Sequence, residues 1–436
     1  MRLLPAALSS TTSILGISIS NTAVSMVALS QQHSHYQLTH YGITELSGAE
    51  MVDNEIIDVE QMGYIVAELM QRLHLQPTQA ATAIAQALTL TKHLTMPAWL
   101  SEAEIEAQIY IDAEQYIPYP IAEASFDFEV LRFVATAHDQ NIQYNQNKAN
   151  SGNTNSNHTN IANGNSRANG NGSEAVTVLL VASLSHHIEQ LIDTFRFADI
   201  KPQFIEADNH AIERAWQLIC QQPSSYPAVV ALIDIGHSRT RVYVAHQGIF
   251  VYQNEQLFGG SQLTESLQTN YLLNTGQAQQ VKTNWPEKVQ DVNIDNLDKE
   301  YVAQHLMPFA DSLVDHIKQA LQAYFQPQPQ ISQSTLDNQQ HPSQIEPKPI
   351  LDSAPQIEQV VLCGGSAALS QLDLILQDKL GLPVSIANPF DGMSIRLGID
   401  KQQLQQDAPR LMTACGLSLR ACQSVQHSRK RGLWRK

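Results

Sequence analysis

The most regular hydrophobic pattern in the chain lies between residues 228 and 260. It opens with a continuous apolar run, Ala228 to Ile233, which is typical of a strand buried on both faces. Two alternating runs come after short polar turns, Arg239 to Ala245 and Ile249 to Leu257. The stretch therefore predicts three consecutive strands. It ends at Gly259-Gly260, directly before a helical pattern.

A weaker copy of this pattern lies near the N-terminus. The segment Ile17 to Val27, which opens with Ile17-Ser18-Ile19-Ser20, matches the segment Ile233 to Tyr243, which opens with Ile233-Asp234-Ile235-Gly236. Two strand, turn, strand units about half a chain apart predict two similar α/β halves that face each other. Each turn would offer backbone N–H and hydroxyl groups to a shared cleft, where small residues let a phosphate approach the main chain. The repeat therefore predicts a nucleotide site.

The rest of the pattern alternates strands with helices, which supports an α/β class independently. Apolar residues at helical spacing predict helices over Asp58–Leu73, Ser185–Phe197, Asp208–Cys220, Val302–Phe325 and Leu411–Leu419. Further strands are predicted at Thr82–Ala87, Ser125–Val134, Val176–Ala182, Pro202–Ala207 and Ile357–Cys363. Ser101 and Glu104 form a capping box for a helix that would run to Gln115.

Two polar stretches interrupt the pattern. Asn141–Ser173 is rich in Asn, Gly and Ser, and Gln326–Gln356 in Gln, Pro and Ser, so neither can bury enough apolar surface to offset its ordering entropy. We expect both to be flexible insertions. The resulting domain plan is a first half at 13–80, an inserted subdomain at 81–184, a return to the first half at 185–225, a second half at 226–422 and a basic tail at 423–436.

Composition narrows the functional classes. A net charge of -16 argues against non-specific nucleic-acid binding, which needs phosphate-neutralising Lys and Arg. The four cysteines show no CxxC spacing, and the sixteen histidines show no HExxH or Cys/His grouping, so no metal site of that kind is predicted. No apolar stretch approaches the ~20 residues that span a bilayer. We expect a cytoplasmic protein that meets the membrane only through partners.

Several motifs resemble, in chain order, the type IV pilus assembly protein PilM family. They are Glu114–Pro120, Asp234-Ile235-Gly236 with Thr240, Leu257–Glu265, Cys363–Ala367, Asn388-Pro389-Phe390 and Ala414–Arg420. That family is similar to the cell-division protein FtsA and belongs with the actin-like ATPases. The resemblance implies duplicated domains around a nucleotide cleft, an inserted small subdomain, and a helix at Asp208–Cys220 that links the halves.

The resemblance also implies which residues hold ATP. Asp234 would help hold Mg²⁺ through water, because hard cations prefer oxygen ligands. The phosphates would be wrapped from the first half by Gly16, Ser18, Ser20, Asn21 and Thr22, and from the second half by Gly236, His237, Ser238, Thr240, Gly259 and Gly260. The turn Gly364-Gly365-Ser366 would contact the adenosine, although each of these glycine turns can also be a plain strand-to-helix connection.

At two positions the chain departs from the family. Ser18 stands where the family usually has an acidic residue, and Ser25 stands where many relatives carry lysine. Phosphoryl transfer depends on electrostatic positioning, so losing two such groups should slow it by orders of magnitude. We expect nucleotide binding with weak or absent hydrolysis.

The string Tyr116-Ile117-Pro118-Tyr119-Pro120 is the most family-specific motif. In the family this region helps bind the cytoplasmic N-terminal peptide of the inner-membrane protein PilN. The alternative that the two tyrosine rings pack beneath the turn stays open. The acidic residues just before the string predict a solvated helix face, and the basic tail predicts a solvated end more than a lipid contact.

Three functions fit this sequence. The leading hypothesis is a scaffold that couples nucleotide state to assembly of the pilus machine, with PilN, other machine components and possible self-association as interactions. An active ATPase or sugar kinase of the same fold is the rival, but Ser18 lies where we would look for its general base. A filament-forming division protein similar to FtsA is the third, and the Tyr116–Pro120 string favours the pilus hypothesis over it.

Overall fold

The computed structural model describes residues 15–32, 35–76, 79–134, 175–221, 226–286, 300–325 and 356–426, and every structural statement below concerns these residues. The predicted flexible insertions lie almost entirely outside them, as does most of the basic tail. The described chain forms two compact units. The first unit holds the residues up to Thr89 and from Ser183 onward, and the second holds Leu90–Ala182.

The first unit contains two large sheets that share the order of five strands, and β16 extends the first of them. One sheet has the order β10 (Lys201–Ala207), β6 (Gln79–Ile84), β1 (Leu15–Ile19), β2 (Ala23–Gln32), β3 (His35–Glu45) and β16 (Ser394–Ile395). The other has the order β15 (Val384–Ile386), β14 (Gln359–Cys363), β11 (Val229–Ile235), β12 (Thr240–His246) and β13 (Ile249–Gln256). In both sheets the first three strands along the chain are antiparallel, and the next two run parallel to the central strand. The predicted duplication is confirmed.

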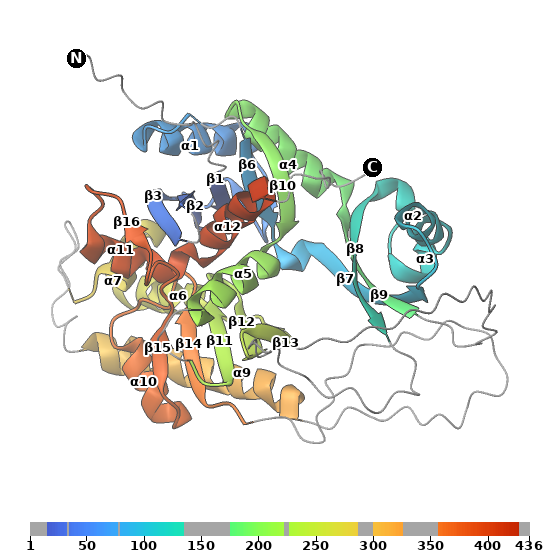
Figure 1. Ribbon diagram of the computed structural model, residues 1–436. Helices are drawn as coiled ribbons and strands as arrows, with labels where there is room; N and C mark the ends of the chain where they lie inside the picture. The colour runs from blue at the N-terminus through green and yellow to red at the C-terminus, as the bar shows by residue number, and fades with distance from the viewer. Residues whose placement is uncertain are drawn as a thin grey trace, which may run out of the picture. The chain divides into compact units, whose positions relative to one another are not determined.

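Helices with one apolar stripe cover the outer face of each sheet (Figure 1). On the first sheet these are α1 (Val59–Arg72) and α4 (Ser185–Phe197), and on the second they are α6 (Gly260–Tyr271), α7 (Thr275–Asn284), α9 (Met307–Phe325) and α10 (Leu372–Leu380). In α1, Met62, Val66 and Leu69 share one face and are buried against the sheet. A π-helical turn, η3 (Tyr301–Leu306), precedes α9, so Pro308 lies at the start of the regular helix.

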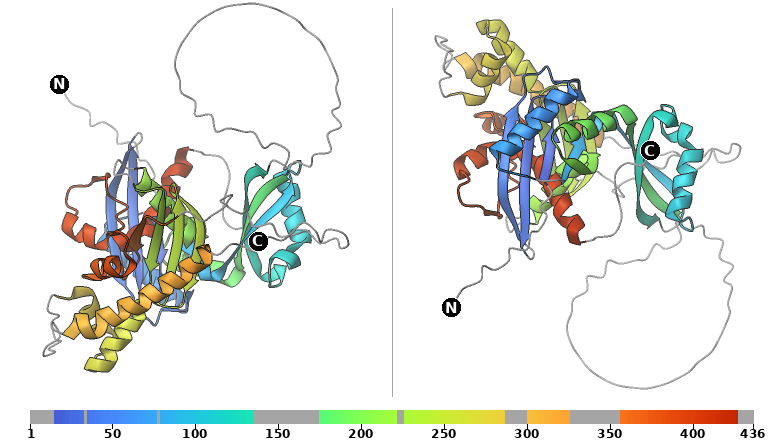
Figure 2. Two further views of the ribbon diagram at one scale, coloured as in Figure 1. Left: turned by 90° about the horizontal axis from the view of Figure 1, so that it is seen from below. Right: turned by 90° about the horizontal axis from the view of Figure 1, so that it is seen from above.

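Two helices lie between the sheets, α5 (Asp208–Cys220) and α12 (Met412–Gln426), as Figures 1 and 2 show. α5 buries Ile212, Ala215 and Trp216 against the second sheet, whereas α12 packs mainly on the first. α5 and α12 approach so closely at Gly416 that no side chain would fit there. A Cβ at Gly416 would lie 1.8 Å from the carbonyl oxygen of Ala211 in α5. The absence of a side chain at Gly416 is therefore what allows the two inner helices to touch.

Some element boundaries differ from those predicted. The strand expected at Thr82–Ala87 is β6 at Gln79–Ile84, and it belongs to the first sheet and not to the inserted unit. Several short elements carried no clear periodicity: the hairpin β4 (Met51–Val52) and β5 (Glu55–Ile56), β16, η1 (Gln86–Leu88), α11 (Lys401–Asp407) and η5 (Ala408–Leu411). The elements of two to four residues are too short to show an alternation, and the seven-residue α11 has a single apolar position, Leu404.

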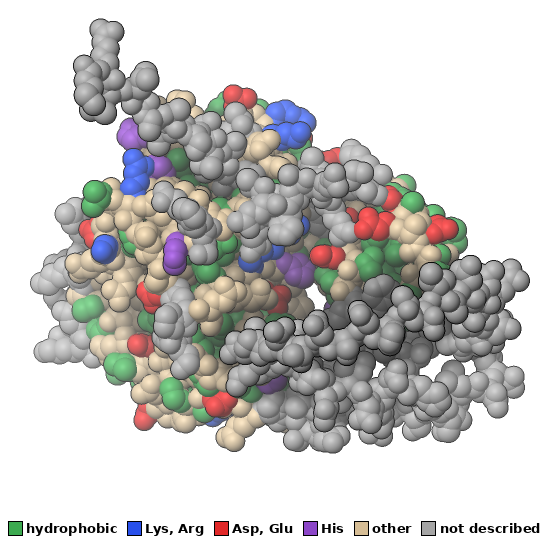
Figure 3. All heavy atoms as spheres, in the orientation of Figure 1, with side chains coloured by type: hydrophobic (Ala, Val, Ile, Leu, Met, Phe, Trp, Pro, Cys, Tyr) green, Lys and Arg blue, Asp and Glu red, His purple; other side chains and the backbone are tan. Residues whose placement is uncertain are grey.

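The second unit is a three-stranded sheet with the order β7, β9, β8, packed against two helices. Its elements are β7 (Thr89–Pro97), α2 (Glu102–Ile111), α3 (Ala113–Tyr116), η2 (Ile121–Glu123), β8 (Ala124–Val134) and β9 (Ala175–Leu184). The predicted Ser101–Glu104 capping box is present, but the helix ends at Ile111 instead of Gln115, and α3 follows after a break at Asp112. Of the acidic side chains predicted to face solvent, Glu102, Glu104 and Glu114 are exposed, whereas Glu106 and Asp112 are partly buried, and Figure 3 shows acidic groups over α2 and α3.

None of the helices in the described part of the chain combines the length and the hydropathy that a membrane-spanning segment requires.

Candidate functional site

The two central strands of the first unit place Ser18 and Asp234 at equivalent positions. In β11, Ile233 and Ile235 face the outer helices, whereas Leu232 faces α5. In β1, Ile17 faces the outer helices and Gly16 faces α12. Because side chains alternate along a strand, Asp234 and Ser18 both point from their sheets toward the inner layer. The sequence alignment of the two halves therefore matches their three-dimensional arrangement.

Three turns of the second half form one backbone framework. The Gly260 N–H donates to the carbonyl oxygen of Gly236 at 2.9 Å, and the Ser261 N–H donates to that of His237 at 2.7 Å. The Ser366 N–H donates to the carbonyl oxygen of Ile235 at 3.0 Å. The strand-to-strand turn after Asp234, the start of α6 and the turn after β14 are thus held together, as the nucleotide prediction requires.

The glycines of this framework have two different reasons for lacking a side chain. A Cβ at Gly260 would lie 2.2 Å from Ser366 Oγ, and one at Gly259 would lie 2.5 Å from the carbonyl oxygen of His237. Gly364 has φ +90° and its Cβ would lie 2.3 Å from Asp234 Oδ1. These three glycines are needed by packing or by backbone geometry. A Cβ at Gly365, in contrast, would meet no atom of the described residues within 4 Å beyond its immediate neighbours, so it faces open space.

Lys282, on α7, supplies a buried positive charge beside this framework. Its side chain is 5% exposed, and its Nζ donates to the carbonyl oxygen of Gly260 at 3.1 Å. An ammonium group can donate three hydrogen bonds, so it has capacity for further acceptors. Burial lowers the pKa of Lys282 to about 8, with a smaller contribution from Arg410. The sequence did not indicate this residue, because a single lysine in a polar helix carries no distinguishing pattern.

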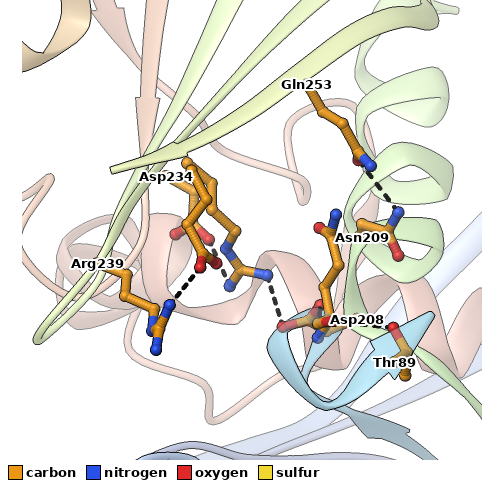
Figure 4. Close-up of polar contacts among 9 residues, drawn as sticks. Thr89, Asp208, Asn209, Asp234, Arg239 and Gln253 are labelled. Carbon is orange, nitrogen blue, oxygen red and sulfur yellow. Dashed lines mark hydrogen bonds and ion pairs between the residues drawn. The ribbon is translucent and has the colours of Figure 1, made fainter. Parts of the chain in front are cut away.

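Asp234 is engaged by an arginine. Its Oδ2 lies 2.9 Å from a guanidinium nitrogen of Arg241, and another nitrogen of the same guanidinium lies 2.6 Å from Asp208 Oδ2. Asp208 Oδ1 in turn accepts a hydrogen bond from the Gln86 N–H at 3.0 Å. Figure 4 shows Asp234 and Asp208 within this network. Burial raises the pKa of Asp234, and Arg241 opposes that rise.

This network bears on the predicted magnesium site. A hydrated Mg²⁺ needs an accessible carboxylate charge, and the charge of Asp234 is already paired with Arg241 in a site where the aspartate is only 7% exposed. The contacts of Asp234 therefore do not fit a magnesium ion. The register of the hairpin could have indicated Arg241, because Asp234 lies directly opposite it in the β11–β12 ladder.

The remaining predicted residues of the second half lie around the same turn. Thr240 is buried, and its hydroxyl donates to the carbonyl oxygen of Phe258 at 2.7 Å, so its side chain is used within the fold. His237 and Ser238 are partly exposed. Burial and the nearby Lys282 lower the pKa of His237, which keeps its ring neutral near neutral pH.

In the first half the predicted residues make local contacts. The Ser20 hydroxyl donates to the carbonyl oxygen of Ala23 at 2.9 Å, and Asn21 Oδ1 accepts from the Asn54 N–H at 2.9 Å. The carbonyl oxygen of Thr22 accepts from the Leu46 N–H at 2.8 Å. A Cβ at Gly16 would lie 2.2 Å from the carbonyl oxygen of Ala414, so helix packing accounts for this glycine.

The two halves meet near Lys282 through η5. Arg410 in η5 forms an ion pair with Glu45 at the end of β3, and the Gly364 N–H donates to the carbonyl oxygen of Pro409 at 2.9 Å. Arg410 and Glu45 also influence the pKa of Lys282, the first lowering it and the second raising it. Arg410 and Glu45 therefore both act on the charge of Lys282.

The predicted partner-binding string lies in the second unit and contributes to its core. Ile117 is buried, and Tyr116 and Tyr119 are partly buried against the same cluster. Burial raises the pKa of Tyr119 to about 12. Pro118 and Pro120 are exposed. The rings thus pack beneath the turn, and the prolines form its outer surface.

Comparison with known proteins identifies the family. The family model described as type IV pilus assembly protein PilM matches residues 16–144, 165–336 and 352–422.

Among solved structures, a PilM-PilN type IV pilus biogenesis complex has a chain that is 17% identical, with a TM-score of 0.66 over 94% of this chain and 98% of that one. MreB 5 of Spiroplasma citri bound to AMPPNP is 12% identical, with a TM-score of 0.42 over 95% and 99% of the two chains. Ta0583, an archaeal actin homolog, is 9% identical, with a TM-score of 0.41 over 94% and 99%. The likeness to the pilus complex chain confirms the predicted α/β fold with two similar halves, and the chain belongs to the type IV pilus assembly protein PilM family.

Proposed function

We propose that this protein is a cytoplasmic, nucleotide-binding scaffold of the type IV pilus assembly machine. It would bind the N-terminal cytoplasmic peptide of PilN and so be held at the periphery of the inner membrane. The observation that carries the proposal is the family match, which extends through both halves and the inserted unit, together with the likeness to a PilM chain solved in complex with PilN.

The nucleotide part of the proposal is supported by the framework of turns in the second half. Lys282 is a buried cation that donates to Gly260 of this framework, and Gly365, in another turn of the same framework, faces open space. An anion such as a phosphate group would satisfy the lysine, and a purine or ribose could lie on the bare backbone of Gly365. We therefore propose ATP as the ligand.

Hydrolysis is proposed to be weak or absent. Ser18 supplies no charge at the position equivalent to Asp234, and Asp234 itself is paired with Arg241. With neither carboxylate available, the site lacks the groups that position a metal ion and water for phosphoryl transfer. ATP would then act as a conformational ligand, whose influence on partner binding can be no larger than its preference for one state of the protein.

The partner part of the proposal assigns the string Tyr116–Pro120 to the PilN contact. The buried Ile117 and the partly buried tyrosines anchor the turn, so the two exposed prolines are presented on a rigid support. A rigid surface loses little entropy on binding, which favours recognition of an extended peptide.

The deciding experiment is a fluorescence polarisation titration of a labelled PilN N-terminal peptide against the full chain, with and without ATP. We expect saturable binding, an affinity that changes when ATP is present, and no binding of a scrambled peptide. A Pro118→Ser, Pro120→Ser double variant should bind more weakly while keeping the same melting temperature. Absence of binding in both conditions would refute the scaffold, and equal affinity in both would refute the coupling alone.

A further inference from the structure

A cluster of two histidines and a glutamate lies in the first unit, apart from the contacts described for the cleft. His186 and His187 are the second and third residues of α4, and Glu55 is in β5 of the small hairpin. One potential ligand atom from each of the three lies within 4.8 Å of the others. The rings of His186 and His187 are 3.9 Å apart between centroids, so two neighbouring side chains converge instead of diverging around the helix.

The hydrogen bonds around His187 leave one of its nitrogens facing a second acceptor. The Ser183 hydroxyl lies 2.8 Å from the carbonyl oxygen of Leu88 and 3.4 Å from His187 Nδ1. When it donates to Leu88, its oxygen accepts from Nδ1, and the Nε2 lone pair then points at Glu55 Oε1, 3.3 Å away. In that tautomer a cation between Nε2 and the carboxylate would satisfy both atoms.

A cation between His187 and Glu55 could be a proton or a metal ion, and the presence of His186 distinguishes these two possibilities. An ion pair between His187 and Glu55 needs only those two groups. His186 brings another imidazole nitrogen within 4.8 Å of the other two ligand atoms, which a proton does not need and a metal does. The fixed Nδ1 contact is also what metal-binding histidines use, since a hydrogen bond at one nitrogen orients the other toward the metal.

We propose that Glu55, His186 and His187 form a site for a divalent transition metal of the zinc class. Imidazole and carboxylate together favour zinc and its first-row neighbours over magnesium and calcium, which prefer all-oxygen sites. Ligands at about 2.0–2.2 Å from a tetrahedral zinc lie roughly 3.4 Å from one another. The pair His187 and Glu55 already has this spacing at 3.3 Å, and the exposed His186 can turn inward to complete it.

The site would join segments that are far apart in the sequence. Glu55 follows Asn54, whose N–H donates to Asn21 in the first strand turn. His187 contacts Ser183, the residue at which the chain returns to the first unit. A bound metal would therefore fasten the β4–β5 hairpin, and the turn that it contacts, to the start of α4.

The test measures Zn²⁺ binding to the full chain by competition with a chromogenic chelator, and Co²⁺ binding by its visible absorption. We expect one equivalent bound with tetrahedral-type Co²⁺ absorption and a rise in melting temperature with Zn²⁺. His186→Ala and Glu55→Gln should each weaken binding by at least tenfold and remove the thermal shift. His186 is exposed, so its variant should melt like wild type without metal.

His35→Ala is the matched control, because His35 is an exposed histidine on the far end of β3 and should leave binding unchanged. The proposal is overturned if wild type binds no equivalent of Zn²⁺ with these properties. It is equally overturned if His186→Ala and Glu55→Gln bind as wild type does, or if His35→Ala loses as much affinity as they do.

Discussion

The two halves of the first unit share one topology but differ in the charge that they bring to the central turn. Residues 16–25 of the first half include no charged side chain, whereas residues 234–241 include Asp234, Arg239 and Arg241. Lys282 adds another charge on the second side. The duplicated backbone has thus been kept while the electrostatics have become one-sided. The first half thus has a serine, Ser18, at the position equivalent to Asp234, which is itself paired with Arg241.

This difference shows that the order of the strands in each sheet does not depend on the polar residues of the turns. The shared sheet order is set by buried strands and outer helices, none of which depends on the polar residues of the turns. Ligand affinity, metal use and hydrolysis depend on those polar residues alone. Variants that change the residues of one half at a time can therefore test how much each half contributes to stability, ligand binding and hydrolysis.

The largest effect is expected for Arg241→Gln. It leaves the buried Asp234 and the partly buried Asp208 without their partner, and removing one partner of a buried ion pair typically costs about 3–5 kcal/mol. Urea unfolding at pH 7 measures the change. Arg239→Gln removes a more exposed pair with Glu255 and should cost at most about 1 kcal/mol. Equal costs for the two variants would contradict the assigned network.

Gly16→Ala tests the first half at the position equivalent to Leu232. The added methyl would lie 2.2 Å from the carbonyl oxygen of Ala414, so overpacking should cost about 1–3 kcal/mol. Chemical denaturation measures it. Gly276→Ala in α7 meets only an ordinary contact at 3.5 Å and serves as the control. An unchanged stability for Gly16→Ala would mean that packing does not explain this glycine.

Lys282→Met should weaken ATP binding by about 10- to 100-fold, since hydrogen bonds to charged groups contribute about 1.5–3 kcal/mol. The pH dependence has a definite sign. With a pKa of about 8 in the free protein, Lys282 is charged below pH 8, and above it a proton must be taken up on binding. Wild-type affinity should therefore fall between pH 8 and 10, and calorimetry of Lys282→Met should show no such fall.

Gly365→Val should weaken ATP binding by about tenfold without changing the melting temperature, because its side chain would project into open space. Nucleotide titration and thermal unfolding of the same preparation separate the two readouts. A variant that melts earlier would show that the space is filled by protein, and one that binds ATP normally would place the ligand elsewhere.

The smallest effect is expected for Ser18→Asp. Restoring an acidic group to the first turn should raise phosphate release by less than tenfold, because Asp234 stays paired with Arg241. A malachite-green assay measures it. A large increase would show that the first half alone had limited the chemistry.

The sequence correctly predicted the helices whose apolar residues recur at helical spacing along their whole length. The bounds of α4 at Ser185–Phe197 and of α5 at Asp208–Cys220 agree with the prediction to the residue, because each has a full apolar stripe. The hairpin at Met51–Ile56 was missed because two-residue strands show no alternation. Within the site, the glycine turns were predicted from order in the chain, and the structure brings those of the second half together.

The pairs that charged side chains form were harder to predict from the sequence. Arg241 could have been placed opposite Asp234 by counting from the turn, but its bond to Asp208 joins residues 33 apart through the tertiary fold. Glu55 and His187 are 132 residues apart, and no local pattern connects them. The nucleotide-binding role of the turns and the PilN contact of Tyr116–Pro120 stay predictions for the experiments above.

The strand β16 and the helix α12 come from the last part of the chain, yet both complete the first sheet: β16 pairs with β3, and α12 covers β1 and β2. During synthesis, the N-terminal half must therefore wait on the ribosome with one sheet edge and one apolar face uncovered until residues near 420 have emerged. A nascent chain in this state exposes the features that chaperones bind. Release of a chain truncated before residue 394 should accordingly yield an aggregating fragment and not an independently folded half.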